Sequence, residues 1–176
     1  DLEHLKLNCQ AKPSDLLFLT KPLGVGLLTT AEKRGLLEAG HHGLARETML
    51  KPNTIGIALS KVKGVNAMTD VTGFGLAGHL TEMCSASGVM AQIDFRRLPR
   101  LAEAEGYRRQ GAVPGGTVRN RDALGSALPV MDEAHWQWLC DPQTSGGLLI
   151  SVAADKADTL VTHAKSARGE ATCVID

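Results

Sequence analysis

The sequence predicts a domain of the α/β or α+β class, in which helices pack on a β-sheet. Short apolar runs of the length of strands alternate with stretches that have helical periodicity, and Gly, Pro or capping residues separate them. The chain has 176 residues, of which 43% are hydrophobic and 22% charged. That length and composition are typical of one globular domain with a buried core.

Five runs predict strands. The first follows the turn signal Pro13-Ser14-Asp15 and reads Leu16-Leu17-Phe18-Leu19, which is typical of a buried strand. The other four predicted strands are residues 65–71, 89–95, 148–152 and 171–175.

Two helical stretches are expected between the first two strands. Residues 27–37 are rich in good helix formers. Residues 44–62 also have a helical pattern, but Pro52 lies inside it. An interior proline removes a hydrogen bond and clashes with the preceding turn, so we expect a kink or two segments that meet near Lys51.

A longer helix is expected over residues 73–87. Leu76, Leu80 and Met83 fall on one face of a 3.6-residue period. Thr72 is placed to cap the start of this helix, and Gly88 to end it.

The second half of the chain has weaker signals. Residues 101–110 predict a short helix, and residues 111–125 predict the longest irregular segment because they contain Pro114-Gly115-Gly116. Asp132 is expected to cap a helix that runs through Leu139.

A turn-rich loop, residues 141–147, leads into the predicted strand at 148–152. Asp155 then predicts the cap of a last helix, whose inward residues are Leu160, Val161 and Ala164.

Charge and cysteine usage exclude several classes of protein. Nineteen basic and 19 acidic residues give a net charge of zero, which argues against nucleic acid as the main partner. No apolar run approaches the ~20 residues of a membrane span. The four cysteines are too widely spaced for a C-x-x-C site and too few for a disulfide scaffold, so we expect reduced thiols in a cytoplasmic protein. They are Cys9, Cys84, Cys140 and Cys173.

A glycine motif, Gly73-Phe74-Gly75-Leu76-Ala77-Gly78, matches the G-x-G-x-x-G pattern of dinucleotide-binding proteins. It follows a predicted strand, it opens a predicted helix, and Asp94 lies about 20 residues further on, where such proteins bind ribose. Against this hypothesis, Asp70 would repel a nearby pyrophosphate, and the unit sits in the middle of the chain. The alternative is that these glycines only let the helix pack closely on the sheet.

Asp70 itself, at the end of a predicted strand, has two interpretations. Its carboxylate can stabilise the start of the following helix as an anion. It can also hold Mg²⁺, which prefers one or two carboxylates together with water and phosphate oxygens. Only one carboxylate is visible at this point, so a metal site needs ligands from elsewhere.

Four separated blocks of the sequence resemble the selenophosphate synthase family, in the same order. They are Leu19-Thr20-Lys21-Pro22-Leu23-Gly24, Met68-Thr69-Asp70-Val71-Thr72-Gly73-Phe74-Gly75-Leu76, Gly111-Ala112-Val113-Pro114-Gly115-Gly116-Thr117 and Cys140-Asp141-Pro142-Gln143-Thr144-Ser145-Gly146-Gly147-Leu148-Leu149. The resemblance covers nearly the whole chain. It displaces the dinucleotide hypothesis, because the glycine motif is part of the second block.

The resemblance implies an α+β fold with a mixed β-sheet covered by α-helices, the C-terminal domain of the aminoimidazole ribonucleotide synthetase-like type. Residues 1–13 would be an arm from a missing N-terminal ATP-binding domain, and residues 14–176 the C-terminal domain. The family converts selenide, ATP and water into selenophosphate, AMP and phosphate, as a homodimer. Its nucleophile, Cys or selenocysteine, lies in the N-terminal domain. Cys9 does not match that nucleophile, so we expect no catalytic residue here and no activity of the chain alone.

The resemblance also implies site residues. Asp70 matches an aspartate that holds Mg²⁺ at the phosphates of ATP together with carboxylates of the N-terminal domain. Main-chain amides and hydroxyls at Thr144, Ser145, Gly146 and Gly147 can lie near phosphate, although they can also merely shape a turn. The implied partners are ATP, selenide and the N-terminal domain, with no nucleic acid and no membrane.

Several other residues and functions stay open. Thr117 and Asn120 have the same two interpretations as the glycine-rich loop, and Arg119 and Arg121 are expected to be solvated. His41-His42 has no third ligand nearby and predicts a surface loop. A non-catalytic module of the same fold, which binds a nucleotide or a partner protein, is the alternative function.

Overall fold

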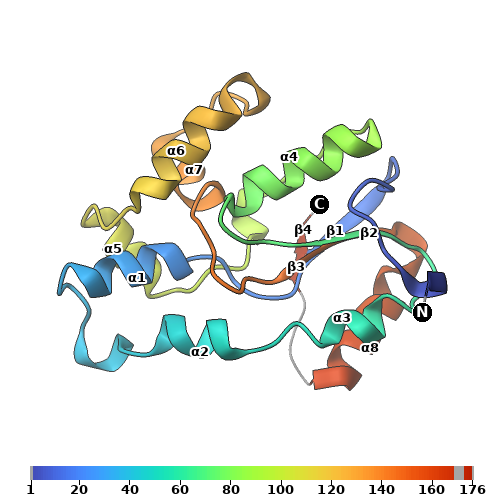
Figure 1. The fold of residues 1–176 in the computed structure, drawn as a ribbon, viewed down its shortest axis with the longest axis horizontal. Coiled ribbons are helices and arrows are strands. Elements are labelled where there is room, and N and C mark those ends of the chain that lie inside the picture. The colour runs from blue at the N-terminus through green and yellow to red at the C-terminus, as the bar shows by residue number, and fades with distance from the viewer. Residues whose placement is uncertain (1, 169–172, 176) are drawn as a thin grey trace.

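The computed structural model describes residues 2–168 and 173–175, which form a four-stranded sheet with helices on both faces (Figure 1). The order of strands is β2 (Val65–Asp70), β3 (Leu148–Ala153), β1 (Asp15–Leu19) and β4 (Cys173–Ile175). All three pairings are antiparallel. The α+β class is therefore confirmed, but the expectation of a mixed sheet is wrong.

The sheet is buried on both faces, which explains its uninterrupted apolar runs. Successive side chains of a strand point to opposite faces. Leu17 and Leu19 of β1 accordingly pack with α1 (Val25–Lys33) and α4 (Gly75–Ser87). Phe18, between them, packs on the other side. There the cover is α3 (Ile55–Leu59) and α8 (Ala157–Arg168), which lie across the sheet from α4 in Figure 1.

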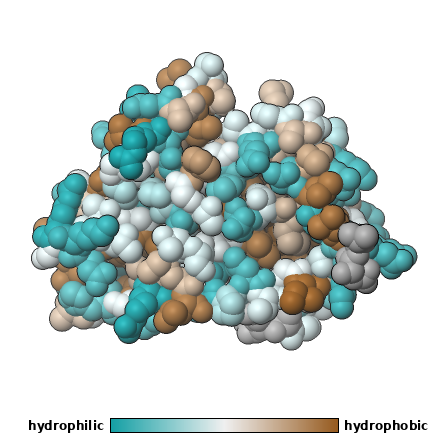
Figure 2. All heavy atoms as spheres, viewed as in Figure 1, coloured by the Kyte–Doolittle hydropathy of each residue, from teal (hydrophilic) through white to brown (hydrophobic). Residues whose placement is uncertain are grey.

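The remaining helices extend the first of these layers. They are α2 (Leu44–Leu50), α5 (Ala104–Arg109), α6 (Gly115–Leu124) and α7 (Glu133–Leu139). Trp138 of α7 is 1% exposed and is part of this core. Figure 2 shows one face of the molecule, on which hydrophilic and hydrophobic residues are interspersed. No helix in the described part of the chain combines the length and the apolar character that crossing a bilayer requires.

Three local predictions are confirmed. Pro52 separates α2 from α3, as expected of an interior proline. The side chain of Asp132 accepts a 2.8 Å hydrogen bond from the main-chain N–H of His135 and caps α7. Gly88, with φ of 67°, ends α4 in the left-handed conformation.

Residues 89–95 are not a strand. They form a loop that ends in a 3-10 turn, Phe95–Arg97, capped by the side chain of Asp94. Ile93 and Phe95 pack against the core instead of pairing with the sheet. The outer edge of β2 is contacted by the N-terminal arm, where the N–H of Met68 donates to the carbonyl oxygen of Leu7 over 3.0 Å.

Residues 111–125 are not one irregular segment either, because they contain α6. Pro114 has extended backbone angles and directly precedes the first turn of α6, where a missing N–H costs nothing. Thr72 does not cap α4: Phe74 is at that position, and no side chain bonds there. Asp155 lies in a 3-10 turn, Ala154–Lys156, directly before α8 and pairs with Lys156 at 3.0 Å. Of the predicted last strand, residues 171–172 lie outside the described residues.

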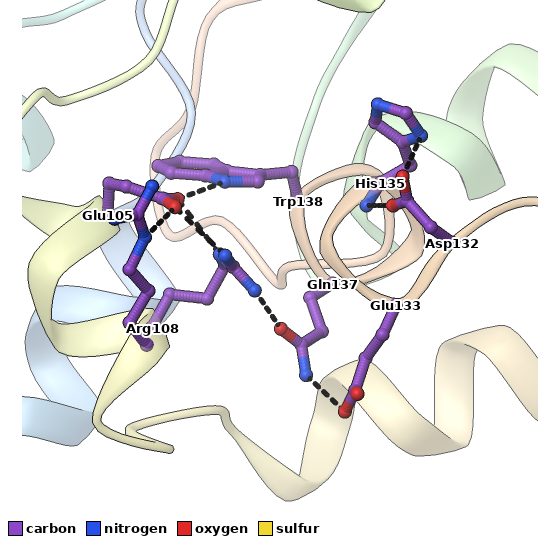
Figure 3. Close-up of polar contacts among 8 residues, drawn as sticks. Glu105, Arg108, Asp132, Glu133, His135, Gln137 and Trp138 are labelled. Carbon is purple, nitrogen blue, oxygen red and sulfur yellow. Dashed lines mark hydrogen bonds and ion pairs between the residues drawn. The ribbon is translucent and has the colours of Figure 1, made fainter.

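A polar network joins α5 to α7 (Figure 3). The carboxylate of Glu105 accepts hydrogen bonds from Arg108 at 2.9 Å and from the indole N–H of Trp138 at 3.0 Å. Gln137 accepts from Arg108 and donates to Glu133. Hydrogen bonds from Arg108, and then from Arg109 and Trp138, lower the pKa of Glu105 to about 2 against the effect of burial. This network fixes α7, which leads directly into the glycine-rich loop.

Candidate functional site

Asp70 is the last residue of β2, and its side chain is exposed. In the sheet it is the register partner of Leu148, the first residue of β3. The glycine-rich loop, residues 141–147, ends at that same point. The ladder therefore places Asp70 beside the end of the glycine-rich loop, whose last residue is Gly147.

The glycine-rich loop is hydrogen-bonded to two other sequence blocks. The carbonyl oxygen of Gly147 accepts from the N–H of Val71 at 2.8 Å, and the N–H of Gln143 donates to the carbonyl oxygen of Thr72 at 3.0 Å. On the other side, the hydroxyl of Thr20 accepts from the N–H of Leu148 at 2.8 Å. The segments after β1 and after β2 thus enclose the loop.

Two glycines make this close approach feasible. A Cβ atom at Gly146 would overlap the carbonyl oxygen of Val71. One at Gly75 would lie 2.8 Å from the carbonyl oxygen of Leu139, and Gly75 also has φ of 71°. Gly75 of the G-x-G-x-x-G pattern therefore serves chain packing, as the alternative interpretation held, whereas a Cβ atom at Gly73 would meet no atom within 4 Å.

Helix α6 brings the remaining block to the same place. The side-chain amide of Asn120 donates to the carbonyl oxygens of Gly73 at 2.8 Å and Cys140 at 3.0 Å. Gly116 lies against the ring of Pro142. Thr117 is fully buried, and its hydroxyl has no hydrogen-bond partner among the described residues. All four blocks, more than 100 residues apart at their extremes, meet at one end of the sheet.

Two further polar residues, Lys21 and Asn53, donate hydrogen bonds to main-chain carbonyl groups of the loop. Neither of them has a role that the sequence predicts. Lys21 is 5% exposed, and its ammonium donates to the carbonyl oxygens of Lys51 and Ser145, each at 2.5 Å. Asn53, in the break between α2 and α3, donates to the carbonyl oxygen of Gly146 at 2.8 Å. No motif signals Asn53, because it comes close to the loop only in the folded chain.

Asp141 is buried at the start of α1. Its Oδ2 accepts from the N–H of Gly26 at 3.1 Å and from the amide of Gln143 at 2.7 Å. Its Oδ1 has no hydrogen-bond partner among the described residues, although the nearby N–H of Leu27 also favours the charged form. Burial dominates and raises the pKa of Asp141 to about 7.

His79 of α4 fixes the segment after Asp70. Its Nε2 accepts from the N–H of Thr72 at 3.0 Å and contacts the Thr72 hydroxyl at 3.2 Å. Burial lowers the pKa of His79, while the charges of Asp70 and Glu82 partly offset this. A neutral imidazole that carries its proton on Nδ1 satisfies this geometry.

The two adjacent histidines that the sequence offers, His41 and His42, do not form a metal site with other described residues. His41 contacts the hydroxyl of Tyr107 at 2.6 Å, and His42 is exposed. Among the described residues, no three His, Cys, Asp or Glu side chains are grouped to hold a metal ion. The antiparallel sheet and the absence of a strand at Asp94 remove the βαβ unit that a dinucleotide site requires.

Known proteins resemble this chain over nearly its whole length. Residues 12–175 match the model of the family "AIR synthase related protein, C-terminal domain". The chain is 49% identical over 174 residues to a selenide, water dikinase of Photorhabdus laumondii, which covers 99% of this chain and 50% of the relative. A selenide, water dikinase of Aeromonas hydrophila is 52% identical over 166 residues, covering 94% of the chain and 48% of the relative. The chain spans about half the length of these relatives.

Solved structures share the fold at low sequence identity. A thiamine-monophosphate kinase from Stenotrophomonas maltophilia superposes with a TM-score of 0.65 at 17% identity, over 97% of this chain and 49% of that one. The hydrogenase maturation protein HypE of E. coli gives 0.65 at 19% identity, over 97% of this chain and 45% of that one. Because the family model matches residues 12–175 of the 176, the chain belongs to the AIR synthase related proteins and forms their C-terminal domain.

Proposed function

We propose that this chain is the C-terminal half of a selenide, water dikinase, which makes selenophosphate, AMP and phosphate from selenide, ATP and water. The relatives of about 50% identity bear that name. One structural observation carries the proposal: four blocks distant in sequence converge on the end of the sheet at Asp70. A purely structural domain has no need to gather an exposed carboxylate, a glycine-rich loop and a buried hydroxyl there.

In this proposal Asp70 contributes one Mg²⁺ ligand. A carboxylate oxygen is the ligand type that Mg²⁺ prefers, and Asp70 is exposed and so accessible to a phosphate-bound ion. Bound Mg²⁺ would supply charge neutralisation at the phosphates of ATP. A single carboxylate does not make a complete site, so the other protein ligands must come from the other half of the enzyme. This half alone is accordingly expected to be inactive.

The finer parts of the proposal concern assembly and location. The full-length enzyme would be a cytoplasmic homodimer whose N-terminal domain binds most of the ATP. The Thr144–Gly147 loop would lie near the phosphates. These statements follow from the family resemblance.

The test compares Asp70→Asn with wild type in the full-length protein, under anaerobic conditions with selenide, ATP and Mg²⁺. Phosphorus NMR follows selenophosphate, AMP and phosphate together. We expect Asp70→Asn to reduce turnover roughly 100-fold or more at equal folded content, because one metal ligand is lost. Asp158→Asn, an exposed carboxylate on α8 across the sheet, is the matched control and should leave turnover unchanged.

Two outcomes would redirect the proposal. A wild-type protein that forms no selenophosphate, yet binds ATP or a protein partner, would support the non-catalytic module. Normal turnover of Asp70→Asn at limiting Mg²⁺ would remove Asp70 from the metal site.

A further inference from the structure

The main chain of the glycine-rich loop is held in one orientation by two side-chain donors, the buried Lys21 and the half-buried Asn53. Lys21 fixes the carbonyl of Ser145, and Asn53 fixes the carbonyl of Gly146. Two successive carbonyl groups are therefore turned toward the interior. A loop that only connected α7 to β3 would not need two side chains from distant segments on adjacent peptide groups.

Lys21 is buried although its side chain carries a charge. Burying an ammonium group costs free energy unless its hydrogen bonds are replaced. Lys21 is 5% exposed, and carbonyl oxygens of Lys51 and of Ser145 accept from it at 2.5 Å. Lys21 thereby ties the break between α2 and α3 to the loop.

This orientation sets the direction of the main-chain N–H groups. In a trans peptide the N–H points opposite to the carbonyl of the same peptide group. The N–H groups of Gly146 and Gly147 are therefore turned away from Lys21 and Asn53. Ser145, with φ of 49°, has the left-handed conformation found in main-chain anion nests.

These N–H groups have no acceptor in the described chain. Hydrogen bonds within it include none donated by the main-chain N–H of residues 144–147. Gly146 and Gly147 are nevertheless buried. Since buried main-chain donors are nearly always paired, these donors call for an acceptor from outside this chain.

We infer that the loop of residues 144–147 is a main-chain nest for a phosphate group, with Lys21 and Asn53 as its positioning residues. This inference rests on the proposed function and deepens it, because it gives Lys21 and Asn53 a role that the family resemblance does not assign. Lys21 and Asn53 act through the loop carbonyls and do not themselves contact the phosphate. The nest adjoins Asp70, so that main-chain donors and a bound cation would share the charge of one phosphate chain.

The phosphate group has two sources in this reaction, which are ATP and the inorganic phosphate released. The experiment uses the full-length enzyme and separates them by kinetics. Lys21→Met keeps the length of the side chain and removes both hydrogen bonds, and Asn53→Leu removes the other donor. Asn66→Leu is the matched control, because the amide of Asn66 bonds to Asp15, at 2.9 Å, in the sheet and not to the loop.

For a nest that binds ATP, each variant should raise the KM for ATP about tenfold, the equivalent of one lost hydrogen bond, with little change in kcat. For a nest that binds the released phosphate, the inhibition constant of inorganic phosphate should rise instead. Lys21→Arg, which keeps a charged donor, should restore part of the loss. Asn66→Leu should lower the thermal midpoint without changing either constant.

A direct readout comes from ¹⁵N-glycine labelling of the full-length protein. A non-hydrolysable ATP analogue with Mg²⁺, or inorganic phosphate, should shift the amide resonances of Gly146 and Gly147, and the shifts should disappear in Lys21→Met. Unshifted glycine amides, or unchanged kinetic constants in both variants of an active enzyme, would overturn the nest. A wild type that makes no selenophosphate would instead overturn the proposed function, so the two failures are distinguishable.

Discussion

The main-chain N–H of Thr72 donates to Nε2 of His79 over 3.0 Å, which fastens the segment directly after Asp70 to helix α4. His79 is 8% exposed, so this hydrogen bond is shielded from water. The contact requires Nε2 to be an acceptor. A protonated imidazole is a donor at both nitrogens and would face the Thr72 N–H with no acceptor to offer.

The first prediction concerns acid stability. The pKa of His79 is lowered in the folded protein from 6.5, mainly by burial, so below that pH the unfolded chain binds more protons than the native one. The contribution of His79 is full above pH 6.5 and is lost as the pH falls toward the folded pKa. His79→Gln offers a neutral acceptor, so the stability advantage of wild type over this variant should shrink between pH 8 and pH 5. Urea unfolding at both pH values measures this advantage, and an unchanged value would contradict the role of His79.

The second prediction concerns Gly75. An alanine there must adopt φ of 71° and place its Cβ 2.8 Å from main-chain atoms of Leu139 and Cys140. We expect Gly75→Ala to lower the free energy of unfolding by about 2–4 kcal/mol. Denaturant unfolding of the variant beside wild type measures the loss.

Gly88 provides the control for Gly75. Its φ is 67°, but a Cβ atom added there would have no neighbouring atom within 4 Å. Gly88→Ala should therefore cost only the conformational strain, about 1 kcal/mol. Equal losses in the two variants, measured by denaturant unfolding, would show that the contact between the start of α4 and the end of α7 is not tight.

Elements with strong local signals could be predicted from the sequence. Pro52 breaks a helix because of its own covalent structure, and Asp132 and Gly88 act within one turn of the helix ends. The buried strand β1 has an apolar run that no loop would tolerate. In each case the chemistry that decides the structure lies within a few residues.

The wrong predictions of secondary structure have one cause in common, which is packing between segments that are distant in the sequence. Residues 89–95 have apolar residues suited to a strand, yet Ile93 and Phe95 pack on the core between helices. The start of α6 looks like a loop because of its proline and glycines, but it forms a helix in which Gly116 packs closely against the ring of Pro142. The direction of strand pairing also depends on connections that no single segment reveals.

Some residues of the candidate site could be identified from the sequence and others could not. Asp70 and the Thr144–Gly147 loop could be singled out because they lie in recognisable blocks, and the sheet register places Asp70 opposite Leu148, the residue directly after that loop. Asn53 could not, because it reaches the carbonyl of Gly146 only in the folded chain, and His79 could not, because no motif signals its bond to the main-chain N–H of Thr72, seven residues earlier.

The last prediction concerns Asp141, whose pKa burial raises from 3.8 to about 7. The native protein holds this proton up to about pH 7, whereas the unfolded chain loses it near pH 4. Stability from this group is therefore full below pH 4 and is lost as the pH rises through 7. Asp141→Asn keeps the size of the side chain and an acceptor for Gly26 and Gln143 without any charge.

The stability of Asp141→Asn relative to wild type should therefore increase between pH 5 and pH 8, by roughly 2–3 kcal/mol at 1.36 kcal/mol per pH unit. Urea unfolding of both proteins at the two pH values gives the difference directly, and the contributions of all other titrating groups cancel. A relative stability that stays constant or falls would mean that Asp141 is ionised in the native protein at pH 5. A buried carboxylate at the start of α1 would then be stabilised by the N–H groups of that helix more strongly than burial opposes it.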